Sequence, residues 1–131
     1  PPLDESGRPL VENGKLKLGN LDAMRDWGYA KEYVTAMWLM LQQDKPEDYI
    51  IATNSIFSVR DLCQLAFAHV GLNWEDHVET HEKFARPTEI TASKGDYSKA
   101  KKQLGWKPET SFPELVKLMV DADLELYQGR S

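Results

Sequence analysis

The first strong periodic pattern in the chain is helical, and prolines and glycines separate it from the apolar segments that follow. Four apolar residues recur at positions i, i+3, i+4 and i+7 of this pattern, namely Val34, Met37, Trp38 and Leu41. This spacing predicts an amphipathic helix from about Gly28 to Gln43. Pro46 lies just beyond it, and proline cannot continue a helix. Such a pattern favours a small fold dominated by helices.

Three further helices are predicted from their start and stop signals. They cover residues 58–71, residues 96–105, and a last segment that begins at Ser111. Ser58 and Ser111 each precede an acidic residue by three positions, which is the spacing of a capping box. Glycines follow the first two segments, as they commonly do at helix ends.

Strand signals are weaker than the helix signals. Residues 15–20 alternate polar and apolar side chains, and residues 49–53 form a short β-rich apolar run. Residues 1–14 hold three prolines and two glycines and are predicted to be a linker or loosely packed segment, followed by one domain over residues 15–131. The expected class is α/β, with about four helices and two or three short strands.

Composition restricts the classes of partner. The net charge is −5, and an acidic chain is poorly suited to nucleic acid, which needs a basic face. Cys63 is the single cysteine, so no internal disulfide forms, and a reducing cytoplasmic location is expected. No apolar run reaches membrane-spanning length and no signal-peptide pattern is seen. The chain begins with proline, which suggests that it was processed or cut from something larger.

Several patterns resemble chemical motifs. Tyr97 and Lys101 have the spacing of a short-chain dehydrogenase pair, but they lie on a lysine-rich helix face that predicts exposure. His77 and His81 have a metal-ligand spacing without the third or fourth ligand that zinc needs. No G-x-G-x-x-G loop and no P-loop is present, so the sequence offers no visible site for a nicotinamide cofactor.

Two arginines are stronger candidates for a binding site, and the ligand that they suit is an anion. Arg25 lies between a strand and a helix start, where backbone N–H groups favour negative charge. Arg86 precedes Pro87, which biases it toward an extended conformation. Two guanidinium groups on rigid connections are suited to a diphosphate. The alternative from the same residues is that Arg25 pairs with Asp26, and Arg86 with Glu89.

The segment "LGNLDAMRDWGYAKEYVTAMWLMLQQDKPEDYIIAT", followed by "SVRDL", "RPTEI", "GDYSKAKKQLGWKP" and "MVDADLEL", resembles the carboxy-terminal region of the GDP-mannose 4,6-dehydratase family. This family belongs to the extended short-chain dehydrogenases/reductases that modify nucleotide sugars. The resemblance covers about residues 15–127. It implies a domain that closes over the nucleotide of the substrate, with no complete Rossmann sheet in this chain.

The resemblance also implies roles for individual residues. Arg25 of "RDW" and Arg86 of "RPTE" correspond to arginines that bind the diphosphate of GDP-mannose or another GDP-sugar. Glu89 corresponds to an acid near the ribose hydroxyls. Lys17 and Leu18 are candidates for backbone contacts to guanine.

The Rossmann half that holds NADP in the full-length family enzyme, with its catalytic residues, has no counterpart here. We therefore expect no cofactor in this chain and no activity from it alone in the conversion of GDP-mannose to GDP-4-keto-6-deoxymannose, the first step toward GDP-fucose. Expected partners are the GDP-sugar, the Rossmann half of the same enzyme and a possible second copy in a homo-oligomer. The alternatives are a stand-alone GDP-sugar-binding module or an interaction module that binds no nucleotide.

Overall fold

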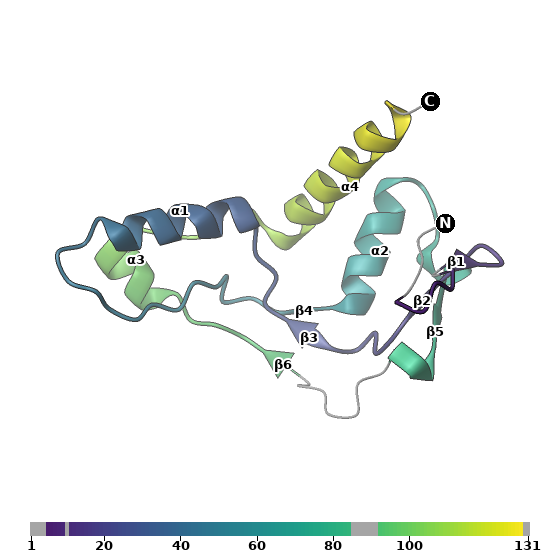
Figure 1. Ribbon diagram of the computed structural model, residues 1–131, viewed down its shortest axis with the longest axis horizontal. Coiled ribbons are helices and arrows are strands. Elements are labelled where there is room, and N and C mark those ends of the chain that lie inside the picture. Colours follow the sequence, from purple (N-terminus) through teal and green to yellow (C-terminus); the bar gives the residue numbers. More distant parts are fainter. Residues whose placement is uncertain (1–4, 10, 85–91, 130–131) are drawn as a thin grey trace. The chain divides into compact units, whose positions relative to one another are not determined.

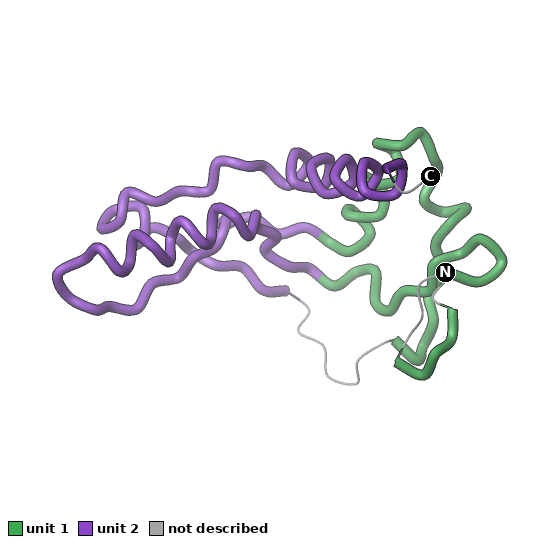
Figure 2. The backbone as a smooth tube through the Cα atoms, turned by 45° about the horizontal axis from the view of Figure 1, so that its top comes forward, with its two compact units in different colours: residues 1–23, 58–91 green, residues 24–57, 92–131 purple. Residues whose placement is uncertain are grey.

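The computed structural model of the chain describes residues 5–9, 11–84 and 92–129. This part contains four α-helices and two three-stranded sheets (Figure 1). The chain divides into two compact units, one formed by residues 1–23 and 58–91 and the other by residues 24–57 and 92–131 (Figure 2). The predicted α/β class is confirmed, and the described part holds no complete Rossmann sheet.

The sheet of the first unit has the order β1-β2-β5. Strands β1 (Val11–Glu12) and β2 (Lys15–Leu18) are antiparallel, and β1 lies within the segment predicted as a linker. Their turn is Asn13–Gly14, and both residues have positive φ, as the commonest two-residue hairpin turn requires. Strand β5 (Val78–Thr80) pairs in parallel with β2, so that Leu18 is aligned with Thr80.

Helix α2 (Val59–His69) packs against the sheet of the first unit through Val59, Cys63 and Phe67. Its predicted capping box is present: the Ser58 hydroxyl accepts the N–H of Asp61, and the Asp61 carboxylate accepts the N–H of Ser58. Buried Cys63 of this helix packs with Leu21 and Val78. Two short 3-10 helices, η1 (Trp74–Asp76) and η2 (Glu82–Phe84), flank β5.

The sheet of the second unit is built from two-residue strands in the order β4-β3-β6. Strand β3 (Met24–Arg25) is central and pairs in parallel with β6 (Ala92–Ser93), which aligns Arg25 with Ser93. Strand β4 (Phe57–Ser58) is at the boundary between the two units. Strands this short give little stability alone, so side-chain hydrogen bonds must help to hold β3.

The helices of the second unit are α1 (Ala30–Leu41), α3 (Ser98–Leu104) and α4 (Phe112–Gln128). Gly105 ends α3 in the left-handed conformation, and Ser111 caps α4 through a capping box with Glu114, as predicted. The Trp106 indole N–H donates to the Glu32 carbonyl at 2.9 Å and connects the segment after α3 to α1. The buried residues of this core are Ala36, Ala100, Leu104 and Trp106.

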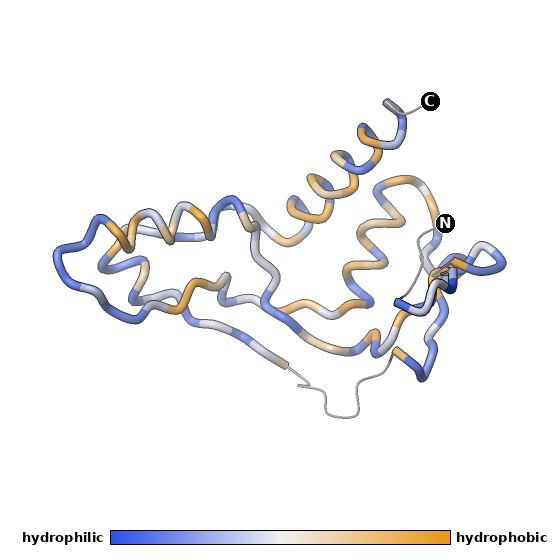
Figure 3. The backbone as a smooth tube through the Cα atoms, viewed as in Figure 1, coloured by the Kyte–Doolittle hydropathy of each residue, from blue (hydrophilic) through white to orange (hydrophobic). Residues whose placement is uncertain are grey.

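The apolar stripe predicted for α1 is real, but it does not face the core. Val34, Met37 and Trp38 are 59–61% exposed and Leu41 is 81% exposed. The core side of α1 is instead formed by Ala36 with Tyr33, Leu39 and Met40. Figure 3 shows hydrophobic residues along α1. We call the four exposed residues the α1 apolar face.

Residues 49–53 were predicted to form a buried strand, and they differ from that prediction in two ways. The segment belongs to no strand in the structure, and Ile50 is 58% exposed. Tyr49 and Ile51 do pack against the core of the second unit. Among the described residues, no helix has both the length and the apolar character needed to cross a bilayer.

Candidate functional site

Arg25 is positioned by the central strand of the second unit. Its backbone lies in β3, opposite Ser93 of β6, and helix α1 begins five residues later at Ala30. The guanidinium Nη1 donates to the Met24 carbonyl at 2.7 Å, and the side chain is half-buried. Arg25 is therefore the last residue of a short strand that was not predicted from sequence, and the predicted helix begins five residues later.

The carboxylate of Asp26 accepts hydrogen bonds from residues other than Arg25. One oxygen, Oδ1, accepts the N–H of Thr53 at 2.8 Å and its hydroxyl at 2.6 Å. The other, Oδ2, accepts the N–H of Asn54 at 3.0 Å and the N–H of Gly95 at 3.2 Å. Four hydrogen bonds fill the acceptor capacity of a carboxylate. This accounts for Asp26 without the ion pair to Arg25 that was the alternative from sequence.

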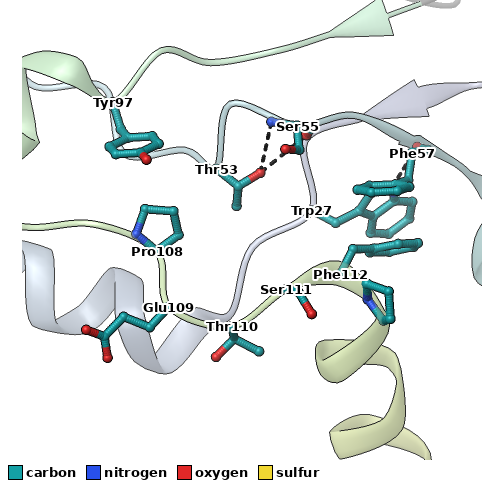
Figure 4. A pocket seen from close by; sticks show the side chains of 11 residues that line it. Trp27, Thr53, Ser55, Phe57, Tyr97, Pro108, Glu109, Thr110, Ser111 and Phe112 are labelled. Atoms are coloured by element: carbon teal, nitrogen blue, oxygen red, sulfur yellow. Dashed lines mark hydrogen bonds between the residues drawn. The ribbon is translucent and has the colours of Figure 1, made fainter.

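Trp27 completes the "RDW" motif as a structural residue. Its indole N–H donates to the Phe57 carbonyl at 2.8 Å, and its ring lies 5.9 Å from the ring of Phe112. The rings of Phe57 and Phe112 are stacked at 4.3 Å. Figure 4 shows these three rings together beside a cavity of about 340 Å³.

That cavity is an unsuitable place for a phosphate. Among the described residues, hydroxyl-bearing and aromatic side chains, prolines and Glu109 line it, and no lysine, arginine or histidine does. A carboxylate repels an anion, and no cation among these lining residues offsets that repulsion. Arg25 does not line this cavity although its neighbour Trp27 does.

Lys17 and Leu18, the candidates for guanine contacts, lie on β2 in the first unit. The Leu18 carbonyl accepts the N–H of His81 at 2.8 Å, so a base would share that carbonyl with His81. The Lys17 side chain hydrogen-bonds Glu12, which raises the pKa of Lys17 and lowers the pKa of Glu12. The lysine thus contributes an ion pair with Glu12 at the surface.

A second cavity, of about 250 Å³, lies in the first unit at the carboxyl ends of the parallel strands β2 and β5. Asn20, Thr80 and His81 line it together with Arg60, whose guanidinium binds Asp22 at 2.9 Å and lies over the Trp74 ring. Carboxyl ends of parallel strands are common ligand sites. Arg60 had no predicted role, although the segment "SVRDL" that contains it carries part of the family resemblance.

The remaining candidates from sequence have structural contacts or lie elsewhere. Arg86 and Glu89 are outside the described residues. His77 stacks on Phe67, and the ring of Tyr97 packs edge-on against Trp106. Within residues 5–9, 11–84 and 92–129, no three histidine, cysteine or acidic side chains gather as metal ligands would.

Two solved structures share this fold over about a third of their own length. UDP-glucose 4-epimerase from Thermotoga maritima, solved with UDP-glucose, has a TM-score of 0.74 and 27% identity, covering 86% of this chain and 36% of that one. RMD from Pseudomonas aeruginosa, complexed with NADPH, has a TM-score of 0.72 and 17% identity. The match covers 84% of this chain and 36% of that one. The fold is therefore that of one part of an extended short-chain dehydrogenase/reductase.

The sequence comparisons narrow this class to one family. The family profile described as GDP-mannose 4,6 dehydratase matches residues 9–119, and the chain belongs to this family. GDP-mannose 4,6 dehydratase 1 of Arabidopsis thaliana is 58% identical over 112 residues, which is 86% of this chain and 31% of that protein. The human GDP-mannose 4,6 dehydratase is 49% identical over 128 residues, which is 85% of this chain and 34% of that protein. The chain spans about a third of the length of these relatives.

Proposed function

We propose that the chain is the carboxy-terminal, GDP-sugar-binding part of a GDP-mannose 4,6-dehydratase. The observation that carries this proposal is the position of Arg25 at the end of strand β3. The next two side chains, those of Asp26 and Trp27, form hydrogen bonds with other segments of the same unit. A guanidinium on such a support suits one end of a diphosphate. Arg86 is proposed as the second cation and Glu89 as a partner of the ribose hydroxyls.

Lys17 and Leu18 are proposed to contact the guanine base through their backbones, as the family resemblance implies. Both residues lie on β2 of the first unit. The cavity of about 250 Å³ at the end of this strand offers backbone and side-chain hydrogen-bond groups, and its volume is small for a whole nucleoside diphosphate.

NADP is proposed to bind the remainder of the enzyme. The cofactor supplies hydride transfer when it is bound, but the residues of this chain do not fit it, because the sequence has no glycine-rich phosphate-binding loop. We therefore assign no catalytic step to this chain. Its role is to bind and orient the GDP-sugar, and alone it is expected to be inactive.

The α1 apolar face is proposed to dock on that cofactor-binding part. Its four side chains are at least 59% exposed, and exposed contiguous apolar surface usually marks an interface. This observation favours a part of a larger enzyme over a stand-alone module. Cytoplasmic location is retained as part of the proposal, because Cys63 is a free, buried thiol.

A GDP titration followed by NMR tests the binding role. Wild type, Arg25→Ala and the control Lys31→Ala, which removes an exposed cation from α1, are compared. We expect weak binding by wild type, roughly millimolar because part of the pocket is absent, and a clear loss in Arg25→Ala alone. Equal affinities for all three proteins would contradict the proposal.

A complementation assay tests the enzymatic part of the proposal. The chain is assayed with GDP-mannose and NADP, alone and together with the cofactor-binding part of the Arabidopsis relative. We expect turnover only in the mixture. Turnover by the chain alone would contradict the proposal that it only binds the substrate. If the two parts bind each other and the mixture still shows no turnover, the result would favour the stand-alone module.

A further inference from the structure

The hydrogen bonds of Asp26 join three separate segments of the second unit. Its carboxylate accepts four hydrogen bonds, two from Thr53, one from Asn54 and one from Gly95. Thr53 and Gly95 are 27 and 69 residues further along the chain.

These bonds begin where the pairing of β3 with β6 ends. Arg25 is aligned with Ser93 in the last register pair, and Asp26 then accepts the N–H of Gly95, two residues beyond Ser93. The carboxylate thus extends a two-residue ladder that would otherwise hold β3 weakly. Successive side chains of an extended segment point to opposite faces, so Asp26 can hold the strand without occupying the face of Arg25.

We propose that Asp26 is the positioning residue for Arg25. Its carboxylate fixes the backbone of β3 against residues 53–54 and Gly95, so that the guanidinium is presented in one place to an anion. The inference rests on the proposed function of Arg25 as a ligand of a diphosphate. Without the carboxylate, β3 would have to become ordered when the anion binds. The conformational entropy lost in that ordering would weaken binding.

The structure contains a closely matched control. The Glu32 carboxylate in the same unit accepts the N–H and the hydroxyl of Thr110 at 2.9 and 2.6 Å, and the N–H of Glu109 at 3.3 Å. It connects α1 to the segment before α4 and has no hydrogen bond to β3. Asp26→Asn and Glu32→Gln each keep one acceptor oxygen and replace the other by a donor NH2, so they disrupt similar networks, of which only one adjoins Arg25.

The experiment measures three quantities on wild type and both variants: the melting temperature, the GDP affinity by NMR, and the Arg25 Nε–H resonance, assigned with Arg25→Ala. Both variants should lower the melting temperature. Asp26→Asn should weaken GDP binding by about tenfold or more, in the range of one lost hydrogen bond to a charged group, whereas Glu32→Gln should not. Only Asp26→Asn should shift or broaden the Arg25 resonance.

Milder variants guard against loss of folding. Thr53→Val and Thr110→Val each remove one hydroxyl donor at 2.6 Å, from Asp26 and Glu32 respectively, and the first alone should move the Arg25 resonance. An unchanged resonance in both Asp26→Asn and Thr53→Val, or equal GDP affinity in the Asp26 and Glu32 variants, would overturn the inference. If Arg25→Ala binds GDP like wild type, the proposed function fails, and the Arg25 resonance still decides the role of Asp26.

Discussion

Gly95 lies so close to Ala52 that a Cβ atom on residue 95 would be 2.3 Å from the Cβ atom of Ala52. Side-chain atoms do not approach each other this closely without displacement. The absence of a side chain at position 95 lets the segment before α3 lie against residues 49–53. It also brings the N–H of Gly95 to the carboxylate of Asp26.

Gly95→Ala should destabilise the second unit. Overpacking at such a contact costs about 1–3 kcal/mol, and urea unfolding followed by circular dichroism measures the loss. Ala52→Gly in the same chain removes the opposing methyl group, so the double variant should recover part of the stability that Gly95→Ala loses. Independent, additive losses in the double variant would show that the two residues do not meet.

Arg25 should be replaceable by lysine only in part. Arg25→Ala should reduce the free energy of GDP binding by about 1.5–3 kcal/mol, the range for hydrogen bonds to charged groups. Arg25→Lys keeps the charge but loses the bidentate geometry, so it should recover some of that loss. Arg86→Ala should not add fully to Arg25→Ala, because both cations act on one ligand. Full recovery by lysine would mean that charge alone matters at this position.

Local signals in the sequence were sufficient for the four helices. Capping boxes at Ser58 and Ser111 depend on residues three positions apart, so they can be identified without tertiary information. The left-handed Gly105 is equally local. The hairpin at Asn13–Gly14 also has a local signal, an Asn-Gly pair, although this segment was predicted to be a linker.

The features that sequence reasoning missed depend on contacts between distant residues. Periodicity showed that α1 has an apolar face, but it cannot show what covers that face, and in this chain the core instead contacts the side of Ala36. Residues 49–53 have a strand-like composition without a paired neighbour strand in the described part. The four hydrogen bonds of Asp26 join residues far apart in sequence, and no spacing rule predicts them.

The α1 apolar face should cause the isolated chain to associate. Exposed apolar patches of several hundred Å² promote such contacts. Sedimentation velocity over a concentration series should show association for wild type and less for Trp38→Glu, with Gln43→Glu as a charge-matched control at an exposed polar site. Trp38 is 59% exposed, so its replacement should change the unfolding free energy little. A wild-type chain that stays monomeric at high concentration would contradict this prediction.

Cys63 should react slowly with thiol reagents in the folded chain. It is 6% exposed, and burial raises the pKa of its thiol despite the nearby Arg60. The reactive species is the thiolate, so both effects slow alkylation at neutral pH. Iodoacetamide labelling followed by mass spectrometry should be slow in buffer and fast in urea. Equal rates in the two conditions would show that the core around Leu21 and Val78 opens readily.

The amino-terminal cap of α4 should make stability depend on acidic pH. The backbone N–H and then the side chain of Ser111 hold the pKa of Glu114 below its usual value of 4.5. A carboxylate whose pKa is lowered by folding stabilises the native state above its unfolded pKa, and this contribution is lost as the pH falls through the folded pKa.

Melting temperatures measured by circular dichroism from neutral pH down to well below 4.5 test this prediction. Glu114→Gln keeps an acceptor for the Ser111 N–H but cannot titrate, so its melting temperature should fall less in acid than that of wild type. Glu125→Gln, near the other end of α4, is the matched control, because its side chain takes no part in the cap. If Glu114→Gln and Glu125→Gln change the acid dependence equally, the effect arises from net charge and not from the cap.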